Sequence, residues 1–140
     1  MEDHSPRNLP PLPKRTVDRD LRSFFGSFGF AFTGLWYMLR NQRNAQVHLL
    51  IGACAVALGA VLGLDRWEWT VLIITIGVVM AAEGFNTAIE SVVDLATDQL
   101  HPHARAAKDV GAGAVLVCAV TSVMVGCLIF IPHLLRWMTP

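Results

Sequence analysis

The chain has 140 residues, of which 54% are hydrophobic, and its formal net charge is zero. This length suggests one domain, and a domain of this size cannot bury so much apolar surface in water, so a soluble globular fold is excluded. The balanced charge provides no basic field for nucleic acid. We therefore expect an all-α membrane protein with no nucleic-acid partner.

The N-terminal part of the chain contains two segments of different character. Residues 1–20 are polar, and four of them are prolines. This composition predicts a disordered cytosolic tail rather than a signal peptide, which would need an apolar core followed by small residues. Residues 21–42, "LRSFFGSFGFAFTGLWYMLRNQ", are rich in aromatic side chains and have basic residues near both ends. They predict an amphipathic helix that lies in the membrane interface.

Three apolar runs follow, at about 47–64, 67–97 and 102–131, and each is long enough to span a membrane. The segment "DRWEW" between the first two predicts a short polar turn, with Trp67 and Trp69 in the interfacial aromatic belt. Seven of the eleven Lys and Arg residues precede the first span, and two more lie between the second and third. By the positive-inside rule, the N-terminus and the second loop are cytosolic.

The cytosolic half of the second span carries acidic residues on one face. At about 100° per residue, Glu83, Glu90 and Asp94 fall within roughly 20° of one line, with Asn86 and Thr87 on either side. Glu90 lies about 10 Å of helix rise beyond Glu83. Ionisable groups at membrane depth are costly and are functional candidates by default. We therefore expect a functional site here rather than a contact between helices.

The chemistry that suits such a face is metal-assisted phosphoryl transfer. One carboxylate can accept a proton from a lipid hydroxyl, a second can hold Mg²⁺ against ATP phosphates, and a lysine can neutralise the transferring phosphate. Lys108 and Asp109, near the start of the third span, face the acids if the two helices form a hairpin. The sequence contains no glycine-rich phosphate loop, so a soluble nucleotide-binding fold is excluded.

Two alternatives from other functional classes remain open. A small proton-coupled transporter also needs a membrane carboxylate, although it needs only one deep acid. A catalytically silent membrane protein would carry the same apolar runs. The transporter interpretation does not explain the remaining polar residues of the face.

The stretch "EGFNTAIESVVDLATDQLHPHARAAKDVGAGAVL" resembles the signature of the prokaryotic diacylglycerol kinase family, which has an E-x-x-N-T/S-A-I-E-x-V-V-D core followed by A-K-D. The earlier stretch "SFGFAFTGLWYMLRNQRNAQVHLL" is similar to the N-terminal segment of that family. The resemblance covers the chain from Arg22 to its C-terminus, and its details are nearer to the undecaprenol kinase branch.

This resemblance implies a homotrimer of three-span subunits in the plasma (inner) membrane, each with an interfacial N-terminal helix. It implies transfer of phosphate from ATP, with Mg²⁺, to a membrane lipid alcohol on the cytosolic side. Undecaprenol is the expected substrate, and diacylglycerol is the alternative.

The resemblance also implies roles for individual residues. Glu83 matches the general base that acts on the lipid hydroxyl, and Glu90 matches a ligand of the metal and of ATP. Asn86 and Asp94 match polar residues that support the site. Further positions that match ATP contacts are Arg22, Phe30, Gln99, Leu100, His101, Lys108 and Asp109.

One position departs from the family pattern. The family has a second metal-ligating glutamate just before the first span, and the matching residue here is Gln42. No Asp or Glu occurs between Asp20 and Asp65, so a shifted alignment does not supply one. Because an amide oxygen brings no negative charge, we expect weaker recruitment of Mg²⁺ at this position.

The histidines and cysteines have simpler interpretations. His101 and His103 flank a proline in a loop, and we expect them to be solvated rather than to bind metal. His48, at the start of the first span, is expected to lie in the interface. The three cysteines all lie in apolar runs, which predicts free thiols rather than disulfides.

Overall fold

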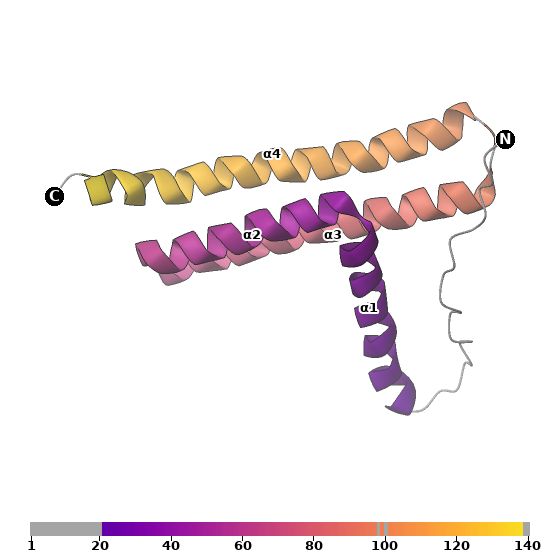
Figure 1. Ribbon diagram of the computed structural model, residues 1–140, viewed down its shortest axis with the longest axis horizontal. Helices are drawn as coiled ribbons and strands as arrows, with labels where there is room; N and C mark the ends of the chain where they lie inside the picture. Colours follow the sequence, from indigo (N-terminus) through magenta and orange to yellow (C-terminus); the bar gives the residue numbers. More distant parts are fainter. Residues whose placement is uncertain (1–20, 98, 100, 139–140) are drawn as a thin grey trace. The chain divides into compact units, whose positions relative to one another are not determined.

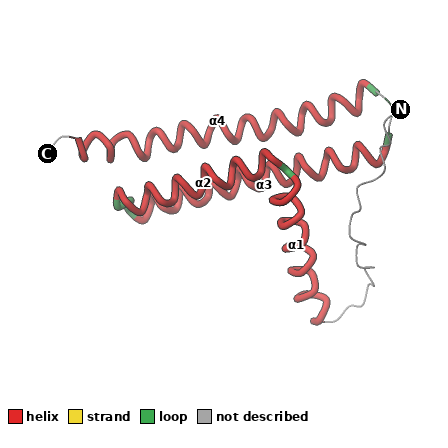
Figure 2. Tube along the Cα trace, viewed as in Figure 1, coloured by secondary structure: helices red, strands yellow, loops and turns green. Residues whose placement is uncertain are grey.

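The computed structural model describes residues 21–97, 99 and 101–138, with side chains from residue 26 onward. The predicted tail of residues 1–20 and Leu100 lie outside the described residues. The described chain is helical throughout apart from short connections (Figures 1 and 2), which confirms the all-α prediction. The helices are α1 (Leu21–Asn41), α2 (Arg43–Leu62), α3 (Arg66–Ala96) and α4 (Pro102–Met138).

The chain divides into two units, residues 1–32 and 33–140. The described part of the first unit is the N-terminal portion of α1. The second unit contains the last turns of α1 together with α2, α3 and α4, and the packing described below concerns this unit.

Helices α2, α3 and α4 are each long and apolar enough to cross a membrane, as predicted. At 1.5 Å per residue, α2 is about 30 Å long, which matches the hydrocarbon thickness of a bilayer. Helices α3 and α4 have 31 and 37 residues. They are therefore about 46 Å and 55 Å long, so both extend beyond a hydrocarbon core of about 30 Å.

The junction of α1 and α2 lies at Gln42, whose backbone is extended at φ −103° and ψ 113°. Its side chain makes no capping hydrogen bond to α2. Instead, the side-chain amide of Gln46 donates to the carbonyl oxygens of Leu39, at 3.0 Å, and Arg40, at 3.3 Å. These bonds satisfy carbonyl groups that the end of α1 would otherwise leave free, and they attach the last turn of α1 to α2.

The connection between α2 and α3 is shorter than the predicted polar turn. Gly63 ends α2 in the left-handed conformation at φ 69°, which glycine adopts without strain. Asp65 then caps α3, since its carboxylate accepts hydrogen bonds from the backbone N–H groups of Trp67, at 2.7 Å, and Glu68, at 2.9 Å. The Glu68 carboxylate accepts in return from the Asp65 N–H at 2.9 Å. Because of this capping box, α3 begins at Arg66, inside the segment predicted as a polar connection.

The two tryptophans of that segment have different environments. Trp69 packs against the small core formed by Leu64, Leu72 and Ile129, with its ring beside Gly59. Trp67 is 77% exposed. The prediction that both residues occupy an interfacial belt stays a prediction, and Trp69 also contributes to the packing at this end of the helices.

Helices α3 and α4 run antiparallel beside each other, so they form the predicted hairpin (Figure 1). Pro102 is the first residue of α4, where its missing N–H has no effect on the helix. The ring nitrogen Nδ1 of His101 accepts a hydrogen bond from the His103 N–H at 3.2 Å. His101 therefore caps α4, which gives the histidine pair a structural role that needs no metal.

Helix α4 continues past Pro132 to Met138, seven residues beyond the predicted end of the span at residue 131. Pro132 has no N–H, so the bond that would reach the carbonyl of Leu128, four residues earlier, is absent. The ring nitrogen Nδ1 of His133 lies 3.0 Å from the carbonyl oxygen of the next residue, Ile129. The other ring nitrogen lies 3.4 Å from Glu68 Oε2, which connects this end of α4 to the start of α3. The three cysteines, at positions 54, 118 and 127, are free as predicted.

Candidate functional site

The candidate site lies on α3 along the predicted acidic face. In the described part of the chain, the buried polar residues are Glu83, Asn86 and Thr87, and they lie within five positions of one another. The Glu83 side chain is only 2% exposed. A carboxyl group buried to this degree is costly unless it has a partner or a function.

Asn86 connects this buried group to Glu90. Its side-chain nitrogen Nδ2 donates to Glu90 Oε1 at 2.9 Å. An ionised carboxylate can only accept hydrogen bonds, so the amide nitrogen faces Glu90 and the amide oxygen must point the other way. Within the described residues, that oxygen and Glu83 Oε2 are buried without a hydrogen-bond partner. Each such orphaned atom costs about 1–3 kcal/mol, so two of them side by side mark a polar site.

Residues from the other helices surround Glu83. The Met38 sulfur, from the last turns of α1, approaches the position that a Cβ of Gly84 would occupy to 3.6 Å, and Met38 is itself buried. His48 on α2 lines a cavity that it shares with Val79 and Met80 of α3, about one helical turn before Glu83. The sequence of α2 alone does not show which part of α3 His48 faces.

Lys108 confirms the expected approach of α4 to the acids. Its Nζ atom lies 2.5 Å from Asp94 Oδ1, across the hairpin, with the two side chains 38% and 65% exposed. Asp109 instead pairs with Arg105 one turn away on α4, at 3.6 Å, and is exposed. The prediction that both residues face the acids is therefore right for Lys108 and wrong for Asp109, because adjacent positions on a helix point about 100° apart.

The remaining predicted contact residues lie in the α3–α4 connection, in the first unit or outside the described atoms. Gln99 and His101 are exposed in the connection before α4. Phe30 is exposed on α1 in the first unit. Arg22 belongs to the same stretch of α1, where only the backbone is described.

Oxygen ligands for a metal ion are few among the described residues of this site. In the portion of the chain that the structure describes, no group of three or more His, Cys, Asp or Glu residues is placed to hold a metal ion. Mg²⁺ usually needs only one or two carboxylates, since phosphates and water supply its other ligands. Glu90, held by Asn86, meets that requirement. Gln42, half-buried at the start of α2, offers an amide oxygen rather than a second carboxylate.

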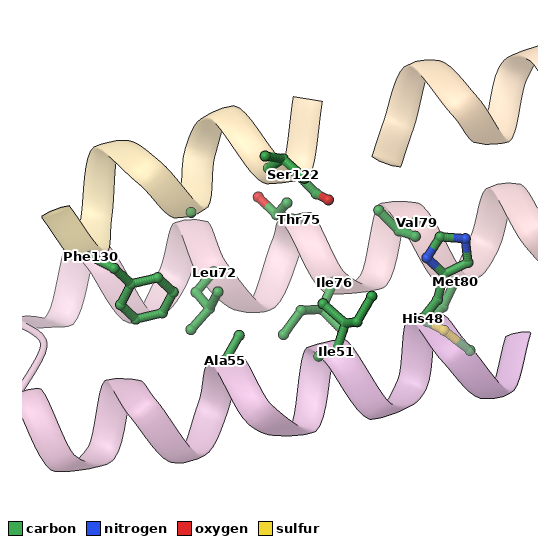
Figure 3. A pocket seen from close by; sticks show the side chains of 13 residues that line it. His48, Ile51, Ala55, Leu72, Thr75, Ile76, Val79, Met80, Ser122 and Phe130 are labelled. Atoms are coloured by element: carbon green, nitrogen blue, oxygen red, sulfur yellow. The ribbon is translucent and has the colours of Figure 1, made fainter. Parts of the chain in front are cut away.

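A cavity of about 190 Å³ lies between α2, α3 and α4 (Figure 3). Its two hydroxyl groups are already used, since Thr75 donates to the Val71 carbonyl and Ser122 to the Ala119 carbonyl, both at 2.7 Å. Apart from His48, the lining is otherwise apolar. On α3 the lining ends at Met80, about one helical turn before Glu83. The cavity therefore suits hydrocarbon rather than a nucleotide.

The chain is similar to known proteins along most of its length. Residues 29–130 match the family model described as prokaryotic diacylglycerol kinase. The chain is 47% identical over 116 residues to undecaprenol kinase of Bacillus subtilis, an alignment that covers 82% of this chain and 94% of that protein. It is 41% identical over 113 residues to a diacylglycerol kinase of Synechocystis, covering 80% and 65% of the two chains. It is 32% identical over 108 residues to diacylglycerol kinase of Escherichia coli K12, covering 75% and 86%.

Proposed function

Because this chain belongs to the prokaryotic diacylglycerol kinase family and is a lipid kinase, we propose that it transfers the γ-phosphate of ATP to undecaprenol. The observation that carries this proposal is the buried Glu83 carboxyl, whose Oε2 atom has no partner among the described residues. It lies on the same face of α3 as Glu90, which Asn86 holds in place. A base and a nucleotide-side carboxylate on one rigid helix are the minimum that this reaction requires.

In the proposed mechanism, Glu83 accepts the proton of the lipid hydroxyl as its oxygen attacks the γ-phosphorus. The bond between that phosphorus and the β–γ bridging oxygen breaks, and ADP leaves. Catalysis of this kind depends mainly on positioning and on charge stabilisation. The burial of Glu83 excludes water that would otherwise compete with the lipid as the acceptor.

The nucleotide lies on the Glu90 side of the site in this proposal. Glu90, with Gln42 as a weaker neutral ligand, would hold Mg²⁺, which when bound supplies charge neutralisation to the phosphates. The Lys108 ammonium supports the same region because it is the cation that α4 brings to the acidic face. Its Asp94 partner keeps the ammonium directed toward α3.

The choice of lipid rests on one observation. The 47% identity extends over nearly the whole of the undecaprenol kinase relative. The apolar cavity that ends one helical turn before Glu83 suits hydrocarbon of either lipid. Diacylglycerol is the second candidate, because other relatives are diacylglycerol kinases.

We further propose the cytosolic side of the plasma (inner) membrane as the location of the site, since most of the Lys and Arg residues lie before α2 or in the α3–α4 connection. In this arrangement α1 lies in the interface. Large apolar side chains are exposed along all three candidate spans, and we propose that they contact lipid and the other subunits of a homotrimer.

The purified chain in detergent, supplied with MgATP labelled at the γ-phosphate, tests this function. The expected result is label in undecaprenyl phosphate after lipid extraction. Label only in phosphatidic acid would identify diacylglycerol as the substrate instead. Transfer to neither lipid would contradict the proposal and favour a transporter or a catalytically silent protein.

A further inference from the structure

Gly111 is the residue of α4 that lies against Asn86. It is buried where α4 packs on α3. A Cβ atom at this position would lie 2.5 Å from Asn86 Oδ1 and 3.6 Å from Asn86 Cγ. The first distance is well inside van der Waals contact, so a side chain at position 111 requires the Asn86 amide or the α4 backbone to shift, and the amide is the more easily moved of the two.

The Asn86 amide cannot be displaced without affecting Glu90. Its oxygen and nitrogen are bonded to the same carbon, and the nitrogen donates to Glu90 Oε1 at 2.9 Å. Rotating the amide by half a turn would set its oxygen against the carboxylate, which is also an acceptor. Moving the oxygen therefore also moves the nitrogen and disturbs the geometry of the bond that holds Glu90.

We propose that Gly111 is a positioning residue of the kinase site, because its missing side chain seats Asn86 so that the amide holds the Glu90 carboxylate toward the nucleotide. This inference rests on the proposed function. The role is specific to position 111 within the glycine-rich start of α4. At Gly113, two residues further along, an added Cβ would meet no described atom within 4 Å.

The test compares Gly111→Ala, Gly113→Ala, Asn86→Ala and the double variant Asn86→Ala/Gly111→Ala, each as the full chain purified in detergent. We expect Gly111→Ala and Asn86→Ala each to lower kcat/KM for MgATP by about tenfold or more, as for loss of a hydrogen bond to a charged group. The matched control Gly113→Ala should remain within about twofold of the wild type. The double variant should be as active as Asn86→Ala alone.

A role in helix packing alone predicts a different pattern. Gly111→Ala would then lower kcat/KM by the same factor whether or not Asn86 is present. That additivity would overturn the proposal, as would a Gly111→Ala variant with wild-type kcat/KM.

A second readout does not depend on activity. Gly111→Ala should lower the midpoint of thermal unfolding by several degrees when Asn86 is present and should not lower it in the Asn86→Ala background, where the space is free. An equal shift in both backgrounds would overturn the steric coupling, whatever the kinase assay shows. Absence of lipid phosphorylation by the wild type would instead overturn the proposed function.

Discussion

Replacing Glu83 by Gln should lower the rate of catalysis without lowering the stability of the fold. The two side chains have nearly the same size, so the substitution removes the proton acceptor without leaving a cavity. Because Glu83 is only 2% exposed, no water or other base can take over its role readily. Loss of a positioned general base lowers rates by about 10²–10⁴-fold, which corresponds to roughly 3–5 kcal/mol of activation free energy.

The same substitution should leave stability unchanged or increase it. Glu83 Oε2 is buried without a partner among the described residues. A neutral amide costs less to bury than a carboxylate, so the midpoint of thermal unfolding should stay constant or rise by a few degrees. KM for MgATP should change little, because Glu90 and Lys108 remain in place.

The assay measures kcat with labelled ATP and undecaprenol, together with the thermal midpoint of each variant in the same detergent. Glu68→Ala is the matched control on the same helix. It removes the capping box and the contact with His133, so it should lower stability by about 1 kcal/mol and leave kcat nearly unchanged. The reasoning is refuted if Glu83→Gln retains about a tenth or more of the wild-type kcat, or if its activity falls only together with its thermal midpoint.

Three further predictions concern the edges of the site and the fold. Gln42→Glu should lower the Mg²⁺ concentration needed for half-maximal activity by several-fold, because it adds a charged oxygen ligand; an unchanged Mg²⁺ titration would argue against a metal role for Gln42. Lys108→Met should lower kcat/KM for ATP by about 10–100-fold, with little change in thermal midpoint because its ion pair with Asp94 is partly exposed. The control Arg105→Met should leave kcat/KM unchanged. Asp65→Ala should lower the free energy of unfolding by about 1 kcal/mol without affecting kcat. A fall in kcat together with the fall in stability would contradict the assignment of Asp65 as a helix cap alone.

The helices and the polar face were predictable because they depend on local patterns. Long apolar runs identify membrane helices directly, since a spanning helix must satisfy its backbone groups internally. The helical period then places Glu83, Glu90 and Asp94 on one line. The short connection between the second and third spans requires a hairpin, and this brings Lys108 to Asp94.

The features that sequence reasoning missed depend on packing between helices. The placement of His48 in a cavity with Met80 requires the register of α2 against α3, and the contact of Gly111 with Asn86 requires the register of α4 against α3. Neither register is encoded in a single helix. The Asp65-x-x-Glu68 capping box, by contrast, is visible in the sequence and marks the start of α3 at Arg66, one residue before the predicted start of the span.

A competition assay between the two candidate lipids measures which of them the kinase prefers. The purified chain is given one pool of labelled MgATP and equal amounts of undecaprenol and diacylglycerol in the same mixed micelles, and the two labelled lipid products are separated and counted. Our account predicts that undecaprenyl phosphate exceeds phosphatidic acid by about tenfold or more, which corresponds to a difference of about 1.4 kcal/mol in transition-state free energy. An excess of phosphatidic acid, or no labelled lipid at all, would contradict it.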